Sequence, residues 1–344
     1  MAAKQTWRLL RDKISEPWMH FAIEEAILRL TDEENQMPTL RIRQTEPSVW
    51  IGYYQIPEED VDVDYCQKNN LKIVRRLNSG GAVYQDFGSF CYTAFFNKAD
   101  FLSSFGLNHT DELYNLFGNV IVNLCNKYNI QAGLSPVNDI TVNNKKIYGS
   151  AQIDWYSAFA HSGSILVNAD LNKMQHALKP SNLKFADKGF KSVRERVVNL
   201  SIIADIPAIK QIKNEFISSF AENLNISLVE QELTEKEKKL ADQLFKEKYS
   251  KPEWTFTVSK PHTTVLSTKI ASGVITLKCQ VFQNRIQSAG ITGDFLMPDH
   301  KKMQKIVNEL NDKTLTQATK IIEKSKLHDD IINGLVHLIK QINA

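Results

Sequence analysis

A glycine turn between two strand-like runs, KIVRRLNSGGAVYQD at residues 72–86, is the feature that most constrains the fold of this chain. Ile73 and Val74 favour an extended backbone before the turn, and residues 82–84 can resume one after it. Gly80 and Gly81 permit backbone angles and close approaches that a β-carbon would block. The stretch therefore predicts a strand, a turn that a ligand can approach closely, and a second strand.

Two features of this turn suit an anion. Successive main-chain N–H groups can form an anion-binding concavity. Arg75 or Arg76 can add a fork of donors that matches a carboxylate or a phosphate. The turn is neither a Walker loop nor a GxGxxG fingerprint followed by a helix. A solvated hairpin and a ligand site therefore both stay open from this stretch alone.

The length of 344 residues favours one large domain plus a smaller one. Hydrophobic residues make up 42% of the chain and charged residues 24%, which is ordinary for a globular protein. The net charge of +3 comes without a concentrated basic stripe, so a nucleic-acid partner is not expected.

The four cysteines lie far apart, at residues 66, 91, 125 and 279. They show no CxxC spacing, which argues against a zinc site or a disulfide scaffold and fits a reducing compartment. The N-terminal MAAKQTWRLLRDK carries charges where a secretory signal has its apolar core, and no apolar run approaches the ~18 residues of a membrane span. We therefore expect a cytoplasmic protein without a membrane anchor.

Mixed strands and helices are expected before the middle of the chain. A helix should begin near Ser15 and Pro17 and carry Glu24 and Glu25 on a solvated or salt-bridged face. A second helix is expected at about residues 111–128. Extended segments are expected at residues 7–10, 39–43, 48–52, 90–96 and 162–168.

A second turn of interest lies in NDITVNNKKIYGSA at residues 138–151. Asn143 and Asn144 form the turn of a predicted hairpin. Lys146 follows this turn and precedes the small residues 149–151. A lysine in such a place is a surface charge in most proteins, but an active-site lysine needs the same placement.

The last part of the chain reads as a separate small unit. Thr234 and Glu237 form a capping box before a helix, and Pro252 follows the end of that helix, so we place a domain boundary there. Alternating residues at 275–281 predict a half-exposed strand, and two later apolar stripes predict helices. Residues 179–191 are polar and without a sustained apolar period, so we expect a loop there.

Five motifs resemble, in order and spacing, those of the lipoate-protein ligase family. They are EPWMHFAIEEAIL at residues 16–28, RRLNSGGAVYQD at 75–86, NDITVNNKKIYGSAQ at 138–152, HSGSILVNADLNKMQHAL at 161–178 and KGFKSVRERVVNL at 188–200. The region from about Trp254 resembles the accessory domain of the two-domain members. The resemblance covers most of the chain. Because residues 188–200 resemble the stretch that follows the family's mobile adenylate loop, it also implies that the loop at residues 179–191 becomes ordered over the bound adenylate.

The resemblance implies an α+β fold. Residues 1–250 would form a catalytic domain of the biotin/lipoate ligase (class II synthetase-like) type, with a large mixed sheet and helices. Residues 251–344 would form a small α/β accessory domain. The implied reaction condenses lipoate with ATP to lipoyl-adenylate and pyrophosphate, with Mg²⁺ on the polyphosphate, and then transfers the lipoyl group to a lysine of an acceptor protein. The acceptor would be the lipoyl domain of a 2-oxoacid dehydrogenase E2 or the glycine cleavage H protein.

The family's motifs also imply roles for individual residues. Lys146 would be catalytic and stabilise negative charge in both half-reactions, and Arg76 would hold phosphate. The metal ligands are not identified. The implied ATP-binding residues are Arg76, Gly81, Ala82, Val83, Tyr84 and Lys146, and the implied lipoate-binding residues are Arg76, Asn78, Gly80, Gly81, Lys146, Gly149, Ser150 and Ala151.

Several positions depart from the family's motifs and predict an altered pocket. The departures are Tyr53 for Arg, Ile56 for Asn, Asn78 for Ser or Thr, Ser79 for the first of three glycines, Gln85 for His, Pro136-Val137 for Gly-Arg and Ser162 for His. They leave open the acyl length that the protein prefers. They also leave open a transferase that uses a preformed acyl donor, and a non-catalytic binder of lipoyl-carrier proteins.

Overall fold

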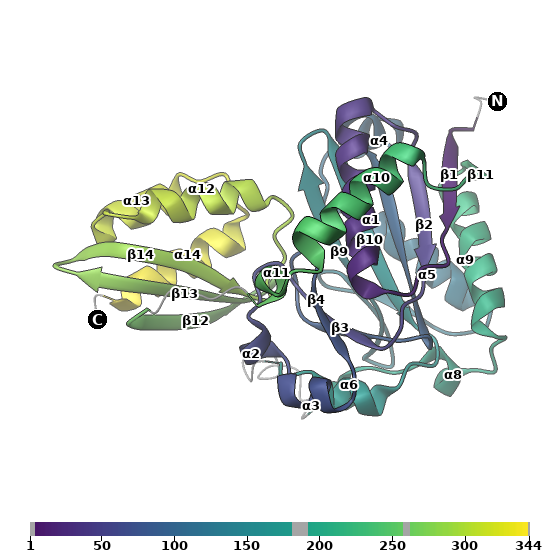
Figure 1. The fold of residues 1–344 in the computed structure, drawn as a ribbon, viewed down its shortest axis with the longest axis horizontal. Helices are drawn as coiled ribbons and strands as arrows, with labels where there is room; N and C mark the ends of the chain where they lie inside the picture. The colour runs from purple at the N-terminus through teal and green to yellow at the C-terminus, as the bar shows by residue number, and fades with distance from the viewer. Residues whose placement is uncertain (1–3, 181–191, 257–261, 343–344) are drawn as a thin grey trace.

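A large mixed sheet forms the centre of the computed structural model, which describes residues 4–180, 192–256 and 262–342. Within these ranges its eight strands follow the order β11-β1-β2-β6-β10-β9-β8-β7. Figure 1 shows helices on both faces of this sheet. The strands are β1 (Thr6–Arg11), β2 (Thr39–Arg43), β6 (Ser89–Asn97), β7 (Gly133–Ser135), β8 (Asp139–Val142), β9 (Lys145–Trp155), β10 (Ala158–Leu166) and β11 (Ser227–Glu230).

Strand periodicity divides the core of this unit between the two faces of the sheet. On β6, Phe90, Tyr92 and Phe96 share one core with α5 (Glu112–Asn126) and α9 (Ile209–Asn223). Cys91 and Phe95 belong to the other core, with α1 (Pro17–Glu34) and α10 (Glu235–Leu244). The remaining helices of this part are α2 (Pro57–Asp60), α3 (Val63–Lys68), α4 (Lys98–Ser104), α6 (Leu171–Ala177), α7 (Val193–Arg196), α8 (Leu200–Ile203), a π-helix (Phe245–Tyr249) and α11 (Pro252–Thr255).

The solvated hairpin considered for the glycine turn is wrong. The turn connects β4 (Lys72–Arg75) to β5 (Val83–Gln85), but these strands do not pair with each other, because β3 (Ser48–Ile51) lies between them. The segment between β4 and β5 therefore crosses over the end of β3. Its side chains are also withdrawn from solvent: Arg75, Arg76, Asn78 and Ser79 are all buried.

The first helix begins at Pro17, close to the predicted start, and the two glutamates singled out from its sequence are buried. Its N-cap is Glu16, whose side chain accepts a hydrogen bond from the N–H of Met19. Glu24 and Glu25 are both buried, so a solvated face is wrong and a salt-bridged one is right. Glu24 lies 2.6 Å from the Arg43 guanidinium, and Glu25 lies 2.6 Å from the Lys248 ammonium.

The C-terminal residues have their own sheet and core (Figure 1). In the described part, β12 (Thr264–Ile270), β13 (Gly273–Phe282) and β14 (Arg285–Gly293) pair in that order, beside α12 (His300–Leu310), α13 (Leu315–Glu323) and α14 (Asp329–Ile342). One expectation fails on β13: Lys278 is buried, and its ammonium lies 2.6 Å from a carboxylate oxygen of Glu59. The division at residues 250 and 251 stays a prediction.

Most of the predicted loop at residues 179–191 lies outside the described residues, from 181 onward. Its ordering over a ligand stays a prediction. In the part of the chain that the structure describes, no helix combines the length and apolar character needed to cross a bilayer.

Candidate functional site

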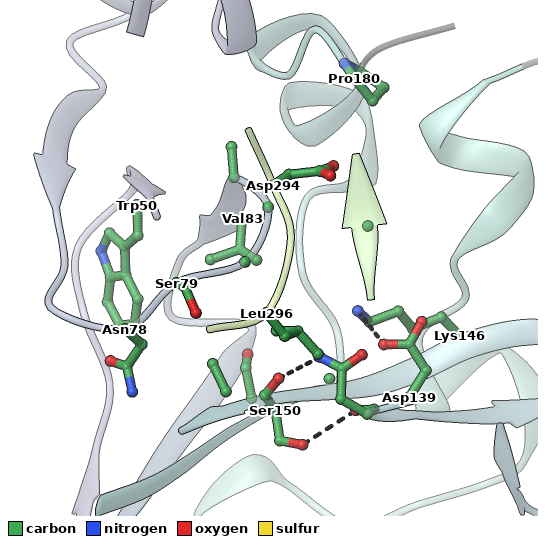
Figure 2. Close-up of a pocket in the computed structure, with 18 of the residues that line it drawn as sticks. Trp50, Asn78, Ser79, Val83, Asp139, Lys146, Ser150, Pro180, Asp294 and Leu296 are labelled. Carbon is green, nitrogen blue, oxygen red and sulfur yellow. Dashed lines mark hydrogen bonds and ion pairs between the residues drawn. The ribbon is translucent and has the colours of Figure 1, made fainter. Parts of the chain in front are cut away.

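The structure gathers every predicted site residue around one cavity of about 290 Å³. The glycine turn forms one wall, β9 and β10 form another, and the segments around residues 269–274 and 294–296 close a third side. Figure 2 shows Lys146 and Asp139 on one side of this cavity and Trp50 and Asn78 on the other. The predicted residues in its lining are Arg76, Asn78, Gly80, Gly81, Ala82, Val83, Tyr84, Lys146, Gly149, Ser150 and Ala151.

Lys146 is positioned by the predicted hairpin of β8 and β9. Asn143 and Asn144 have φ values of 49° and 62°, which asparagine adopts more readily than most residues and which a tight two-residue turn requires. The Lys146 ammonium lies 2.6 Å from a carboxylate oxygen of Asp139. The other Asp139 oxygen lies 3.1 Å from the Arg196 guanidinium. Asp139 therefore holds both cationic side chains, Lys146 and Arg196, at this edge of the cavity.

Gly149 provides the space that the Lys146 side chain occupies. A β-carbon at Gly149 would lie 2.3 Å from the Lys146 ammonium nitrogen. The Lys146 side chain remains 25% exposed, so its charge borders both the cavity and solvent. Its main-chain carbonyl accepts a hydrogen bond from the N–H of Val198 at 3.0 Å, which ties the hairpin to the segment that carries Arg196.

The two arginines of the turn are engaged by main-chain carbonyls. Arg76 donates to Trp50 O at 2.9 Å, to Ser79 O at 3.0 Å and to Gly81 O at 2.9 Å. Arg75 donates to five carbonyls, among them Thr255 O, which lies 180 residues away in the sequence. Burial lowers the pKa of both guanidinium groups to about 10, so both stay cationic near neutral pH. These bonds favour a role for Arg76 in holding the turn, and direct phosphate binding by Arg76 stays a prediction.

Ser79, which replaces a glycine of the family's turn, lines the cavity and also bonds to the C-terminal part of the chain. The Ser79 hydroxyl donates to Met297 O at 2.9 Å and accepts from Met297 N–H at 2.6 Å. The next residue continues this contact, since Gly80 N–H donates to Phe295 O at 3.1 Å. Ser79 therefore fastens the turn to the segment between β14 and α12.

We expect Ser79→Ala to lower the free energy of unfolding by about 1–3 kcal/mol, because it leaves a buried N–H and a carbonyl of Met297 without their partner. Denaturant titration of the variant and the wild type would measure this loss. A difference below about 0.3 kcal/mol would show that the hydroxyl does not fasten the two segments.

The tyrosine that replaces the family's arginine also packs against the C-terminal residues. Tyr53 stacks on His300 with ring centroids 4.0 Å apart. His300 Nε2 lies 2.6 Å from Leu77 O, and its Nδ1 lies 2.9 Å from the Tyr54 hydroxyl. This pattern fits a neutral ring that donates from Nε2 and accepts at Nδ1, and burial lowers the pKa of His300 to about 4.

The His300 contacts should make folding stability depend on pH. Above pH 6.5 the ring is neutral whether the chain is folded or unfolded. As the pH falls from 6.5 to 4, His300 binds a proton in the unfolded chain but not in the folded chain. The free energy of unfolding therefore decreases across that window. In unfolding measurements between pH 4 and 6.5, His300→Gln should reduce the slope of the free energy of unfolding against pH by the contribution of about one bound proton. An unchanged slope would contradict this assignment.

Aromatic and buried polar side chains form other parts of the cavity lining. Phe21 and Trp50 meet edge to face with centroids 4.9 Å apart, and Cys91 lies in the same core. At the position of the family's histidine, the Gln85 amide donates to the Ser164 hydroxyl at 2.7 Å. At the other histidine position, the Ser162 hydroxyl lies 2.9 Å from that of Thr93.

Some lining residues were not identified from the sequence as site residues. Asp139 had a signal, because it opens the hairpin that carries Lys146. Arg43 and Trp50 lie in ordinary strand patterns, and Asp294 and Leu296 come from the C-terminal region, so nothing local marks them. Among the described residues no three His, Cys, Asp or Glu side chains converge as a metal site would require.

Comparison with known proteins places this cavity in context. A model of the lipoyl protein ligase A/B catalytic domain matches residues 16–221. Lipoate-protein ligase A subunit 1 of Thermoplasma acidophilum is 34% identical over 246 residues, which cover 69% of this chain and 90% of that protein.

Three solved structures share the fold. The bipartite lipoate protein ligase of Thermoplasma acidophilum, described with its E2 lipoyl domain, has a TM-score of 0.65 at 32% identity and covers 76% of this chain and 100% of its own. A lipoate-protein ligase A bound with ATP has a TM-score of 0.64 at 31% identity, covering 73% and 98%. LipL1 of Plasmodium falciparum in complex with lipoate has a TM-score of 0.76 at 20% identity and covers 97% and 99%, which supports the fold alone.

Proposed function

Because this chain belongs to the lipoyl protein ligase A/B family, we propose that it is an ATP-dependent lipoate-protein ligase. It activates lipoate with ATP to lipoyl-adenylate and pyrophosphate, and then transfers the lipoyl group to a lysine of an acceptor protein. The observation that carries this proposal is the cavity itself, which has the Lys146 side chain on one side and the aromatic ring of Trp50 on the other.

Lys146 acts in both half-reactions. A carboxylate attacks the α-phosphate of ATP in the first, and an amine attacks the resulting mixed anhydride in the second. Negative charge grows on phosphate oxygens in one step and on the carbonyl oxygen in the other. A fixed ammonium beside that point stabilises both transition states more than it stabilises the substrates. Asp139 holds the ammonium at 2.6 Å and thereby orients it.

Mg-ATP enters as substrate at the glycine turn. Gly81 to Tyr84 line the cavity, and their main chain is the expected contact surface for the nucleotide. Arg76 donates to two carbonyls of this turn, Ser79 O and Gly81 O, and a third bond joins it to Trp50 O on β3. Since the described carboxylates do not converge on a metal site, we propose that Mg²⁺ arrives with the polyphosphate.

The proposed acceptor is a lipoyl domain of an E2 subunit or the glycine cleavage H protein. The similar ligase of Thermoplasma acidophilum is described with an E2 lipoyl domain, which supports the first of these. We also propose that residues 251–344 are the accessory domain of a two-domain ligase. A cytoplasmic location is consistent with the four cysteines, all of which are free thiols.

A transferase that carries the acyl group on a cysteine finds little support in the site. Cys91 lines the cavity, but burial raises the pKa of its thiol, whereas a nucleophilic cysteine needs a lowered pKa. The Lys146 and Asp139 pair also has no evident use in a module that only binds lipoyl carriers.

Two measurements without an acceptor test the activation step. Calorimetry should detect binding of lipoate and of a non-hydrolysable ATP analogue to the same protein. Exchange of labelled pyrophosphate into ATP should depend on lipoate. Absence of binding and of exchange would overturn the proposed function, whereas binding without exchange would restrict it to the transfer step.

A further inference from the structure

The segment at residues 196–199, which begins at the end of α7, is connected to the Lys146 hairpin in two separate ways. Its main chain runs beside β9, where the N–H of Val198 donates to Lys146 O at 3.0 Å and Val197 forms a parallel β-bridge with Lys146. Its first side chain reaches Asp139, with 3.1 Å between the Arg196 guanidinium and a carboxylate oxygen. The segment therefore contacts both the backbone of Lys146 and the carboxylate that pairs with its ammonium.

The backbone that carries Arg196 is fixed by the residues that follow it. The Asn199 side chain is buried and bonds to both main-chain groups of Ala169, accepting from the N–H at 3.0 Å and donating to the carbonyl at 2.8 Å. Val197 is buried as well. With the bond from Val198 to β9, these contacts set where the Arg196 side chain starts, and the Arg196 side chain lines the cavity.

The catalytic ammonium needs to be held, because it lies at the end of a flexible four-carbon stem. Figure 2 shows it directed at Asp139. One contact to an aspartate fixes little, since the χ2 torsion of an aspartate is broad and its carboxylate can turn. The contact from Arg196 to the second carboxylate oxygen defines the plane of the carboxylate. The Asp139 side chain is only 9% exposed, so few water molecules compete for these contacts.

We propose that Arg196 is a positioning residue of the ligase reaction, which acts through Asp139 to hold the Lys146 ammonium where negative charge develops. This inference rests on the proposed function and adds a residue to the same site. The contacts run from guanidinium to carboxylate at 3.1 Å and from carboxylate to ammonium at 2.6 Å. A displacement of about 1 Å at a reacting centre can cost about 10²-fold in rate, so loss of the first contact reaches the chemistry.

A double-mutant cycle tests whether Arg196 acts through Lys146, using lipoate-dependent pyrophosphate release with Mg-ATP. Arg196→Met alone should lower kcat by about 10–100-fold and change KM for ATP by less than about twofold. In a Lys146→Ala background the same change should lower kcat by less than about twofold, because effects of residues that act as a unit do not add. Arg196→Lys keeps a cation for Asp139 and should recover most of kcat.

Arg194→Met is the matched control within the same short helix. Arg194 is exposed and lies outside the cavity lining, two residues before Arg196. Its kcat should stay within about twofold of the wild type, as is usual for exposed surface substitutions. An equal loss of kcat in the Arg194 and Arg196 variants would contradict a specific role for Arg196.

Other results would also overturn the positioning role. An unchanged kcat in Arg196→Met would do so. Losses that multiply in the double variant, or a raised KM for ATP at unchanged kcat, would indicate that Arg196 contacts the nucleotide directly instead. Absence of lipoate-dependent pyrophosphate release by the wild type would overturn the proposed activation step, and this inference with it. If Arg196→Met does not fold, Arg196→Gln takes its place in the cycle and the same outcomes decide.

Discussion

Replacing Lys146 by alanine should lower lipoate-dependent pyrophosphate release by about 10²–10³-fold, the usual effect of removing one electrostatic donor from a reacting centre. The fold should survive the change. The Lys146 main chain keeps its bond to Val198, and Asp139 keeps its ion pair with Arg196 at 3.1 Å. The expected loss lies in kcat, because the charge acts on the transition state.

The neighbouring lysine offers a matched control. Lys145 is exposed and outside the cavity lining, although it carries the same charge one residue away. Lys145→Ala should retain activity within about twofold, as is usual for exposed surface substitutions. Near-native pyrophosphate release by Lys146→Ala, or an equal loss in both variants, would refute the role given to Lys146.

Gly52→Ala should disturb the whole glycine turn. Gly52 follows β3, and a β-carbon there would lie 1.9 Å from Gly80 O. β3 is fixed between β4 and β5, so the turn must move instead. Gly80 also bonds to Phe295, and that contact should be lost with the shift. We expect a stability loss of about 1–3 kcal/mol, typical of overpacking, and a fall of at least about tenfold in pyrophosphate release.

Gly133→Ala is the control for this substitution. Gly133 lies on β7 at the edge of the large sheet, and a β-carbon there would meet no atom within 4 Å. Its thermal midpoint and activity should match those of the wild type. If Gly52→Ala behaves like Gly133→Ala in thermal unfolding and in pyrophosphate release, the turn does not depend on the close approach of Gly52 to Gly80.

Features set by neighbouring residues were predictable from the sequence. The turn at Asn143 and Asn144 has the residue type that its backbone angles demand, so the hairpin and the place of Lys146 follow from local chemistry. The capping box of Thr234 and Glu237 is present as expected. The two strands that flank the glycine turn were also predictable, because the β-branched Ile73 and Val74 precede it and Val83 and the aromatic Tyr84 follow it.

Features set by distant residues were not predictable in this way. Nothing near Arg76 shows that β3 will supply a carbonyl at 2.9 Å, so its burial could not be anticipated. The partner of Ser79 lies 218 residues away in the sequence. The sequence around Glu24 predicts a surface charge, and only the folded chain places Arg43 of β2 beside it. These contacts depend on which strands become neighbours, and that is a property of the whole fold.

Intact-mass spectrometry of an acceptor tests the ligase function most directly. A lipoyl domain and an H protein would each be incubated with this protein, lipoate and Mg-ATP, beside controls without ATP and with preformed lipoyl-adenylate. We predict the gain of one lipoyl group on an acceptor when lipoate and Mg-ATP are both present, and none from lipoate without ATP. No modification of either acceptor, even from lipoyl-adenylate, would contradict the account.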